Sequence, residues 1–269
     1  MAGKYRAMVS TRRLVFFTTA LLLGSVPAVL FADFLWRLGY SIPKGFLLAL
    51  FIILISSVAW GATHAIIGFL SRRMPRRTGR IESSLEHDNE NEETLPAVAI
   101  AMPVYNEDTS RVMAGLKAMY LALEKTGRGE SFDFFVLSDS TDPEKWVREE
   151  YIWSLLCRKL KAFGRIHYRR RSVNTDKKAG NLLEFCQDWG RRYRYMITLD
   201  ADSLMGGDEL VNLVGIMERN HNVGICQTAP RIVFGESFWG RLQQFSNHFY
   251  GPVFMSGLNS WQQGDGNYW

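Results

Sequence analysis

Two long uncharged runs dominate the beginning of the chain. They extend from Leu14 to Ala32 and from Gly45 to Leu70, and neither contains Lys, Arg, Asp or Glu. Each is longer than the roughly 18 apolar residues that suggest a membrane-spanning helix. Because lipid offers the backbone no hydrogen-bond partners, each run is expected to be a helix. The short segment between them predicts a transmembrane hairpin over residues 14–70.

Basic residues flank this hairpin on its two outer sides, whereas the loop between the runs holds only Arg37 and Lys44. The positive-inside rule therefore places both ends in the cytoplasm, with residues 1–13 as a basic N-terminus. A cleaved signal peptide also begins with basic residues, but the length of the first run and the presence of a second favour the hairpin. The arginines that follow the second run are expected to contact anionic lipid.

The pattern of polar and apolar residues changes after the hairpin. Residues 71–95 are charged and poor in apolar positions, which is typical of a solvated linker. From residue 96 onward, short apolar runs alternate with amphipathic stretches of helical length. Strands are expected at 98–102, 132–137, 165–168, 195–199 and 223–227, and helices at 109–125, 142–163, 177–189 and 208–219. This alternation predicts an α/β domain over 96–269, with a mostly parallel sheet flanked by helices.

The composition excludes several other classes of protein. Hydrophobic positions make up 47% of the 269 residues, which excludes a disordered chain. Three scattered cysteines without a C-x-x-C pair indicate reduced thiols. The net charge of +5 is modest, and its placement is more informative than its sum. The arginines after the second run could form a nucleic-acid patch, but their position directly after a span favours anionic lipid. The chain has no Gly-rich phosphate loop, and its histidines lack metal-ligand spacing.

Polar residues follow the predicted strands, and in parallel sheets ligands bind beyond the carboxyl ends of the strands. Glu107 follows the first strand, Asp139 the second and Lys178 the third. Asp200 and Asp202 follow the fourth. The sequence therefore predicts a binding site at this edge of the sheet.

The pair Asp200 and Asp202 is the most specific indication of chemistry at that edge. Residues two apart in an extended backbone point the same way, so both carboxylates would hold a divalent metal, Mg or Mn, together with phosphate oxygens. Such a metal neutralises a diphosphate leaving group, and Lys178 would bind the same phosphates. A D-x-D after a strand is also a common turn and N-cap device, but the other residues at the strand ends favour the metal.

Four further features each leave two interpretations open. Asp139 either accepts hydrogen bonds from a base or ribose or caps its own loop. Glu107 either reaches the same nucleotide or places negative charge at a helix N-terminus. The run Arg169–Arg171 either attracts an anionic donor or forms a solvated turn. The aromatic stretch 237–260 is either core or a membrane-facing surface.

Four short motifs carry a resemblance to a known family. They are P-V-Y-N-E at 103–107, S-D-S-T-D at 138–142, K-A-G-N at 178–181 and L-D-A-D at 199–202. Together with the hairpin, they resemble the processive, cellulose-synthase-like family-2 glycosyltransferases, whose catalytic domain has the GT-A fold.

This resemblance implies roles for the same residues and an activity. Glu107, Asp139, Lys178 and Asp200 would bind substrate, with Asp139 on the uridine, and Asp200 and Asp202 would bind the metal. The implied protein is a multi-pass enzyme of the bacterial inner membrane with a cytoplasmic catalytic domain. It is an inverting hexosyltransferase that adds glucose from UDP-glucose to a growing glucan acceptor. The product would be the β-1,2-glucan backbone of osmoregulated periplasmic glucans.

The chain also departs from that family. The general base and the acceptor-site Gln/Arg/Trp segment of the family are not found before Trp269. The chain is therefore expected to be an amino-terminal fragment that binds the donor but transfers sugar poorly or not at all. One alternative is a non-catalytic scaffold or sensor that binds a UDP-sugar at the membrane. Another is a membrane-tethered nucleotidyl or phosphoryl transferase that uses the same pair of aspartates.

Overall fold

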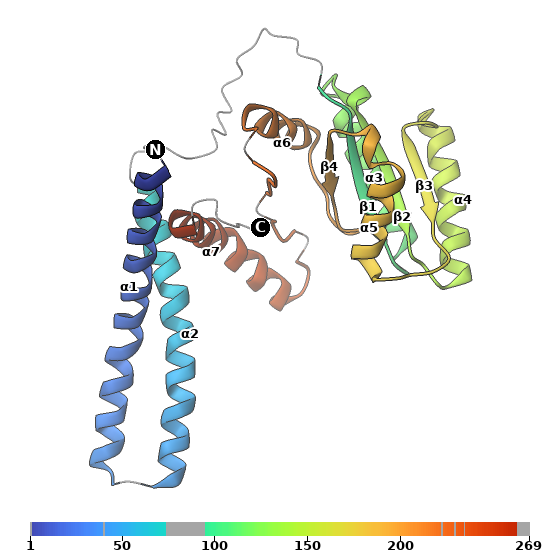
Figure 1. The fold of residues 1–269 in the computed structure, drawn as a ribbon. Helices are drawn as coiled ribbons and strands as arrows, with labels where there is room; N and C mark the ends of the chain where they lie inside the picture. Colours follow the sequence, from blue (N-terminus) through green and yellow to red (C-terminus); the bar gives the residue numbers. More distant parts are fainter. Residues whose placement is uncertain are drawn as a thin grey trace. The chain divides into compact units, whose positions relative to one another are not determined.

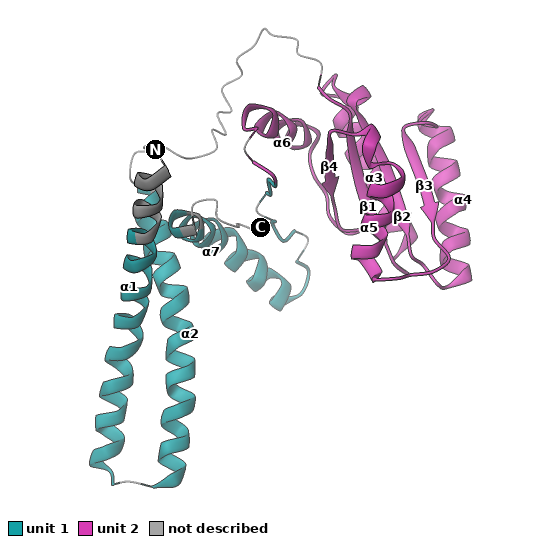
Figure 2. Cartoon of the chain, in the orientation of Figure 1, with its two compact units in different colours: residues 1–80, 225–269 teal, residues 81–224 magenta. Residues whose placement is uncertain are grey.

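The computed structural model describes residues 2–39, 41–73, 95–221, 223–228, 230–233 and 235–262. The chain divides into two compact units, one made of residues 1–80 and 225–269 and the other of residues 81–224 (Figure 2). Residues 74–94, which form most of the predicted linker, and residues 263–269 of the polar tail lie outside the described residues.

The first unit contains the two apolar helices that the sequence predicts, paired as a hairpin (Figure 1). Helix α1 extends over Ala2–Arg37 and helix α2 over Ile42–Arg73. The segments Thr11–Arg37 and Ile42–Ser71 are long and apolar enough to cross a membrane, and only 6% of the most apolar stretch of each is buried. The core helix of a soluble protein would be mostly buried, so these helices indicate membrane association.

A third helix, α7 (Phe238–Gln262), packs against α2 in the same unit. A Cβ atom on Gly257 would lie only 2.1 Å from the carbonyl oxygen of His64, so glycine is what allows the two backbones to approach. The ring of Phe16 is fully buried and stacks on Trp261 at 4.6 Å between ring centroids. The C-terminal part of α7 therefore provides core for the helical unit. The aromatic side chains nearer its start are exposed, with Phe238, Trp239, Phe245 and Phe249 each more than half accessible.

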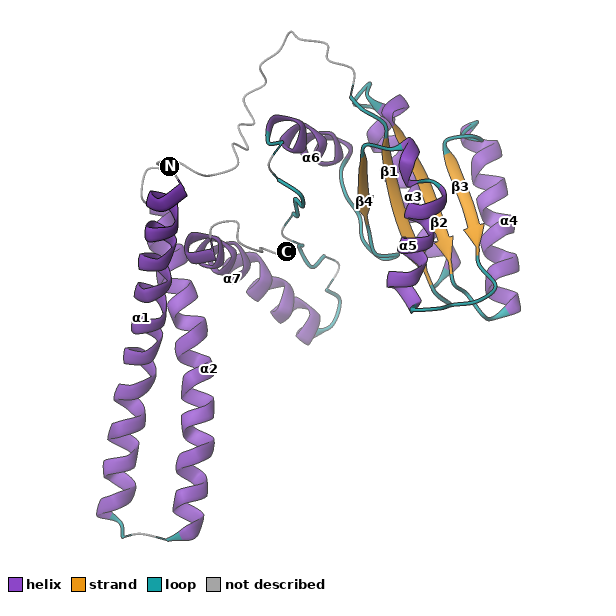
Figure 3. Cartoon of the chain, in the orientation of Figure 1, coloured by secondary structure: helices purple, strands orange, loops and turns teal. Residues whose placement is uncertain are grey.

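The second unit is built on a four-stranded parallel sheet with the strand order β3-β2-β1-β4 (Figure 3). The strands are β1 (Val98–Val104), β2 (Phe132–Ser138), β3 (Ile166–Arg170) and β4 (Tyr195–Thr198). Three of them end level with one another, because Val104 pairs with Ser138 and Ser138 with Arg170. The loops that follow these strands are thereby brought to one edge of the sheet.

Helices join the strands and cover both faces of the sheet, so the predicted α/β fold class is confirmed. They are α3 (Thr109–Glu124), α4 (Pro143–Leu160), α5 (Lys177–Asp188) and α6 (Gly207–Arg219), with short 3-10 turns η1 (Gly129–Ser131) and η2 (Gly190–Arg192). The predicted start of α4 is also correct. Asp142 is the N-cap, its side chain accepts a hydrogen bond from the Glu144 amide at 3.0 Å, and Pro143 occupies the first turn.

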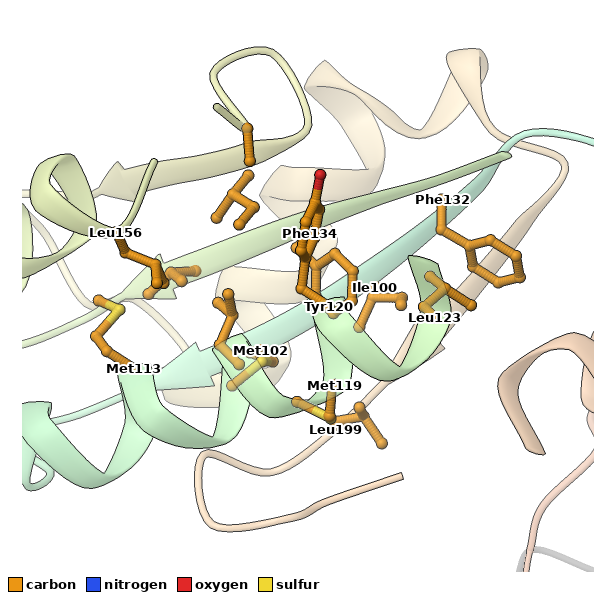
Figure 4. Close-up of a cluster of buried hydrophobic side chains, with 14 of the residues drawn as sticks. Ile100, Met102, Met113, Met119, Tyr120, Leu123, Phe132, Phe134, Leu156 and Leu199 are labelled. Carbon is orange, nitrogen blue, oxygen red and sulfur yellow. The ribbon is translucent and has the colours of Figure 1, made fainter. Parts of the chain in front are cut away.

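The central strand β1 explains why the core has two sides. Its residues alternate, with Ile100 and Met102 facing the larger cluster and Ala99 and Ala101 facing the smaller one. The larger cluster packs α3 and α4 against the sheet (Figure 4), and it also includes Leu210 and Val214 of α6. The smaller cluster packs Phe185 of α5 on the opposite face. A strand buried on both faces is typical of a parallel sheet.

One predicted element is wrong. Residues 223–227 were expected to form a strand, but the described residues 223–228 contain no helix or strand. Strand β4 is the last strand on its side of the described sheet, so this apolar run has no partner strand there.

The contacts of helix α7 (Phe238–Gln262) group this helix with the hairpin. The sequence assigns residues 96–269 to one domain, and that boundary stays a prediction.

Candidate functional site

The loops that follow β1 and β2 are joined to each other through Asn106. This residue has a left-handed backbone, with φ of 54°. Its amide donates to the Ser140 hydroxyl at 2.9 Å, and its side-chain oxygen accepts from the amides of Thr141 and Asp142 at 3.2 Å each. Asparagine tolerates this conformation better than most residues because its short side chain bonds locally. The two predicted motifs, 103–107 and 138–142, therefore form one connected structure.

Asp139, the first residue after β2, is buried and paired with an arginine. Arg171 Nε donates to Asp139 Oδ1 at 2.5 Å, and Arg171 Nη2 donates to Oδ2 at 2.8 Å. Both side chains are less than a tenth exposed. The hydrogen bond to Asp139 raises the pKa of the Arg171 guanidinium, against the opposing effect of burial. Asp139 is thus an oriented carboxylate whose two oxygens both accept from Arg171, and it does not cap its own loop.

The same arginine connects Asp139 to the K-A-G-N motif. Arg171 Nη2 also donates to the carbonyl oxygen of Lys177 at 2.7 Å, at the start of α5. This turn is tight, because Asp176 and Lys177 are both left-handed, with φ of 54° and 50°. A Cβ atom on Gly180 would lie 2.0 Å from the carbonyl oxygen of Thr175, so only glycine fits there. The motif places Lys178 on the first turn of α5.

Lys178 reaches from α5 to the loop that follows β4, where its ammonium donates to a carboxylate oxygen of Asp200. Both side chains are about half exposed or more, at 51% and 64%. Asp139, Arg171, the start of α5 and Asp200 are therefore linked by successive contacts along one edge of the sheet. A cation and a carboxylate that face solvent at this edge can both bind a diphosphate, the carboxylate through a metal ion.

Asp200 and Asp202 lie in a turn, which differs from the expected extended backbone. Strand β4 ends at Thr198, and the Ser203 amide donates to the Asp200 carbonyl at 2.9 Å. The alternation of a strand therefore does not decide where these two side chains point. Both are exposed, and two carboxylates are suitable ligands for a hard divalent cation that completes its shell with phosphate and water. Within the described ranges, no cluster of three or more His, Cys, Asp or Glu is arranged for a metal.

Glu107 lies outside these contacts. It follows β1, its side chain is exposed, and its carbonyl oxygen accepts from Lys145 Nζ at 3.4 Å. The N-cap of α3 is its neighbour Asp108, whose carboxylate accepts from the Ser110 amide at 2.9 Å. Glu107 is therefore not needed to cap the helix and stays available at the edge of the sheet.

The basic run 169–171 is neither an open anion site nor a solvated turn. Arg169 pairs with Glu184 of α5 at 3.3 Å, and Arg171 is bound to Asp139 as described. Only Arg170 is exposed, and its guanidinium lies 4.3 Å from the ring centre of Trp146. Side chains alternate along β3, so neighbouring arginines reach different surroundings.

Two buried polar residues received no role of their own in the sequence analysis, one of them the Asn181 of the K-A-G-N motif. Asn181 donates to the Leu137 carbonyl of β2 at 3.0 Å and is fully buried. Glu149 of α4 is 1% exposed and accepts hydrogen bonds from hydroxyl groups. A signal for Glu149 was present, because it shares the inward face of α4 with Leu156, seven residues further on. A carboxylate on an apolar helix face indicates buried donors nearby.

Comparison with known proteins adds a family to this geometry. Residues 99–266 match the family described as glycosyl transferase family 2. The chain is 45% identical over 226 residues to the glucans biosynthesis glucosyltransferase H of Pseudomonas aeruginosa (strain LESB58). The aligned region is 83% of this chain and 26% of that protein. It is 44% identical over 232 residues to the protein of the same name from Pectobacterium carotovorum subsp. carotovorum (strain PC1), covering 86% and 27%. The chain thus spans about a quarter of the length of these curated relatives.

Proposed function

Because the chain belongs to glycosyl transferase family 2, we propose that it binds UDP-glucose at the carboxyl edge of its parallel sheet and serves a membrane-bound glucosyltransferase. The proposed reaction extends a growing glucan, the β-1,2-linked backbone of osmoregulated periplasmic glucans. Relatives that carry the name glucans biosynthesis glucosyltransferase H support this choice of product class.

The observation that carries the proposal is a line of contacts in two parts. Arg171 joins Asp139 to the Lys177 carbonyl, and the next residue, Lys178, pairs with Asp200. In the proposed complex, Asp139 accepts a hydrogen bond from the uridine, while Lys178 and Asp200 lie at the diphosphate. Glu107, on the loop after β1, is proposed to contact the same donor. A site with a nucleoside-binding end and a charged diphosphate-binding end suits a nucleotide sugar.

The role of the metal follows from the donor set. Asp200 and Asp202 would hold Mg²⁺ or Mn²⁺, which when bound stabilises the negative charge on the departing UDP. Lys178 adds a positive charge beside the same oxygens, which favours the diphosphate as a leaving group. The proposed displacement inverts the anomeric carbon, with an acceptor hydroxyl as the nucleophile. We assign no general base within residues 1–269.

The proposed location is the bacterial inner membrane, in a multi-pass protein. Helices α1 and α2 would cross the bilayer, and the basic residues at their outer ends favour a cytoplasmic position for both ends. A cytoplasmic catalytic domain, proposed here over 96–269, would meet UDP-glucose in the compartment where nucleotide sugars are made, and membrane lipid would surround the hairpin.

The test is a titration of UDP into the purified chain with and without Mg²⁺ or Mn²⁺. We expect Asp202→Asn to remove the metal-dependent part of the UDP affinity. Asp208→Asn is the matched control, because it removes an exposed carboxylate from the first turn of α6. Equal metal-dependent affinity in Asp202→Asn and the unaltered chain would count against the site, and the absence of UDP binding by the unaltered chain would count against the function.

A further inference from the structure

Glu149 of α4 is a buried carboxylate surrounded by hydroxyl groups. It is 1% exposed, and it is hydrogen-bonded to the two residues on either side of Asp139. Ser138 donates to Glu149 Oε2 and Ser140 donates to Oε1, both at 2.6 Å. The Tyr168 hydroxyl donates to Oε2 at 3.1 Å. Three hydroxyl donors on one carboxylate satisfy it without any cation.

The two serines flank Asp139, and this spacing determines what Glu149 controls. Glu149 accepts hydrogen bonds from Ser138 and Ser140, while Arg171 binds the carboxylate of Asp139 between them. All three consecutive side chains are therefore held by buried charged partners.

The hydrogen bonds of this cluster also run in one direction. The Asn106 amide donates to Ser140 Oγ at 2.9 Å, and the Ser140 amide donates to Ser138 Oγ at 3.2 Å. Each serine hydroxyl in turn donates a hydrogen bond to the carboxylate of Glu149. A carboxylate is the group that can end both chains, because it only accepts. Through Ser140, Glu149 holds the loop after β1 as well as the loop after β2.

We propose that Glu149 is a positioning residue for the nucleotide-binding loops, which acts through Ser138 and Ser140 to orient Asp139. This inference rests on the proposed function, because it assigns Asp139 to the nucleoside end of the donor. Burial raises the pKa of the Tyr168 hydroxyl, in keeping with a dry cluster in which hydrogen bonds are strong. The side chain of Glu149 itself does not touch the donor.

The primary test is Glu149→Gln in the full chain, with UDP and Mg²⁺ as the probe. The amide keeps the shape of the side chain but has a single acceptor oxygen, so one serine loses its acceptor. We expect UDP to bind about tenfold more weakly, the loss that about 1.4 kcal/mol produces. Tyr193→Phe is the matched control, because it removes a 2.7 Å hydrogen bond to Asp133 near the opposite end of β2. We expect the control to leave the UDP affinity unchanged.

A double-variant cycle separates positioning from general stability. In an Asp139→Asn background, Glu149→Gln should have little further effect on UDP affinity, because Glu149 acts through Asp139. A purely structural role would lower affinity by the same factor in both backgrounds, and that result would overturn the inference. Unchanged UDP affinity in Glu149→Gln alone would also overturn it.

Hydrogen exchange tests the same inference without a ligand. The amides of residues 139–142 should exchange faster in Glu149→Gln, and those at the start of β1 should not. Ser140→Ala, which removes one link of the same network, is the second variant if Glu149→Gln does not fold. If the unaltered chain binds no UDP, the proposed function fails, and the exchange rates still decide whether Glu149 holds the loop. Unchanged exchange at 139–142 in the variants would refute the positioning role.

Discussion

The buried pair of Asp139 and Arg171 allows a quantitative prediction about stability. We consider Arg171→Met, which keeps most of the length of the side chain but removes the guanidinium. The Asp139 side chain is 7% exposed, so its carboxylate would be left buried without a cation. Removing one partner of a buried pair costs about 3–5 kcal/mol. The lost donation to the Lys177 carbonyl adds about 1 kcal/mol. We therefore expect a loss of about 4–6 kcal/mol in the free energy of unfolding of the sheet unit.

Hydrogen exchange of the full chain in a membrane mimetic measures this loss without the need to unfold the apolar helices. Core amides of β2 and β3 exchange through opening of the unit, so their rates should rise about a thousandfold or more for a loss of this size. Arg170→Met is the matched control. The Arg170 guanidinium is exposed over Trp146, where a cation–π contact contributes about 0.5–1 kcal/mol.

Two results would refute the reasoning. One is an equal acceleration of exchange in Arg171→Met and Arg170→Met, which would mean that the buried carboxylate is not destabilised. The other concerns the double variant Arg171→Met with Asp139→Asn, which leaves no buried charge and should regain most of the lost protection. Failure to regain it would mean that the cost comes from packing, and not from an unpaired charge.

Two further predictions concern packing and pH. Gly257→Ala should loosen α7 from α2 and lower the melting temperature, because its new Cβ atom would lie 2.1 Å from a carbonyl oxygen. Gly251→Ala is the control. Its Cβ atom would lie 3.8 Å from the nearest atom, so the melting temperature should be unchanged. His167 stacks on Phe135 at 4.7 Å, and burial lowers its pKa below the ordinary 6.5. The folded state therefore binds this proton less well than the unfolded state, so stability is complete above pH 6.5 and falls as the pH drops toward the lowered value. His167→Phe should flatten that acid-side loss in exchange measurements between about pH 7 and 5, and an unchanged slope would contradict the assignment.

The sequence by itself determined the elements that depend on local physics. The two uncharged runs predict α1 and α2 because a bilayer requires long apolar helices, and the Asp142-Pro143 pair predicts the start of α4 because capping involves adjacent residues. The strand ends also identify which polar residues gather at one edge, because parallel strands share a direction.

Only the tertiary structure decided the partners of those residues. Arg171 and Asp139 are 32 positions apart, and they meet because β3 pairs with β2. The same pairing gives Glu149 its partner from β3, Tyr168, and it buries Arg171 of the basic run against Asp139. The expected strand at 223–227 is absent for the converse reason, since a strand needs a neighbour and the pattern of apolar residues does not supply one. Hydrophobic period and helix caps are local properties, whereas ion pairs and sheet edges depend on which distant segments the fold brings side by side.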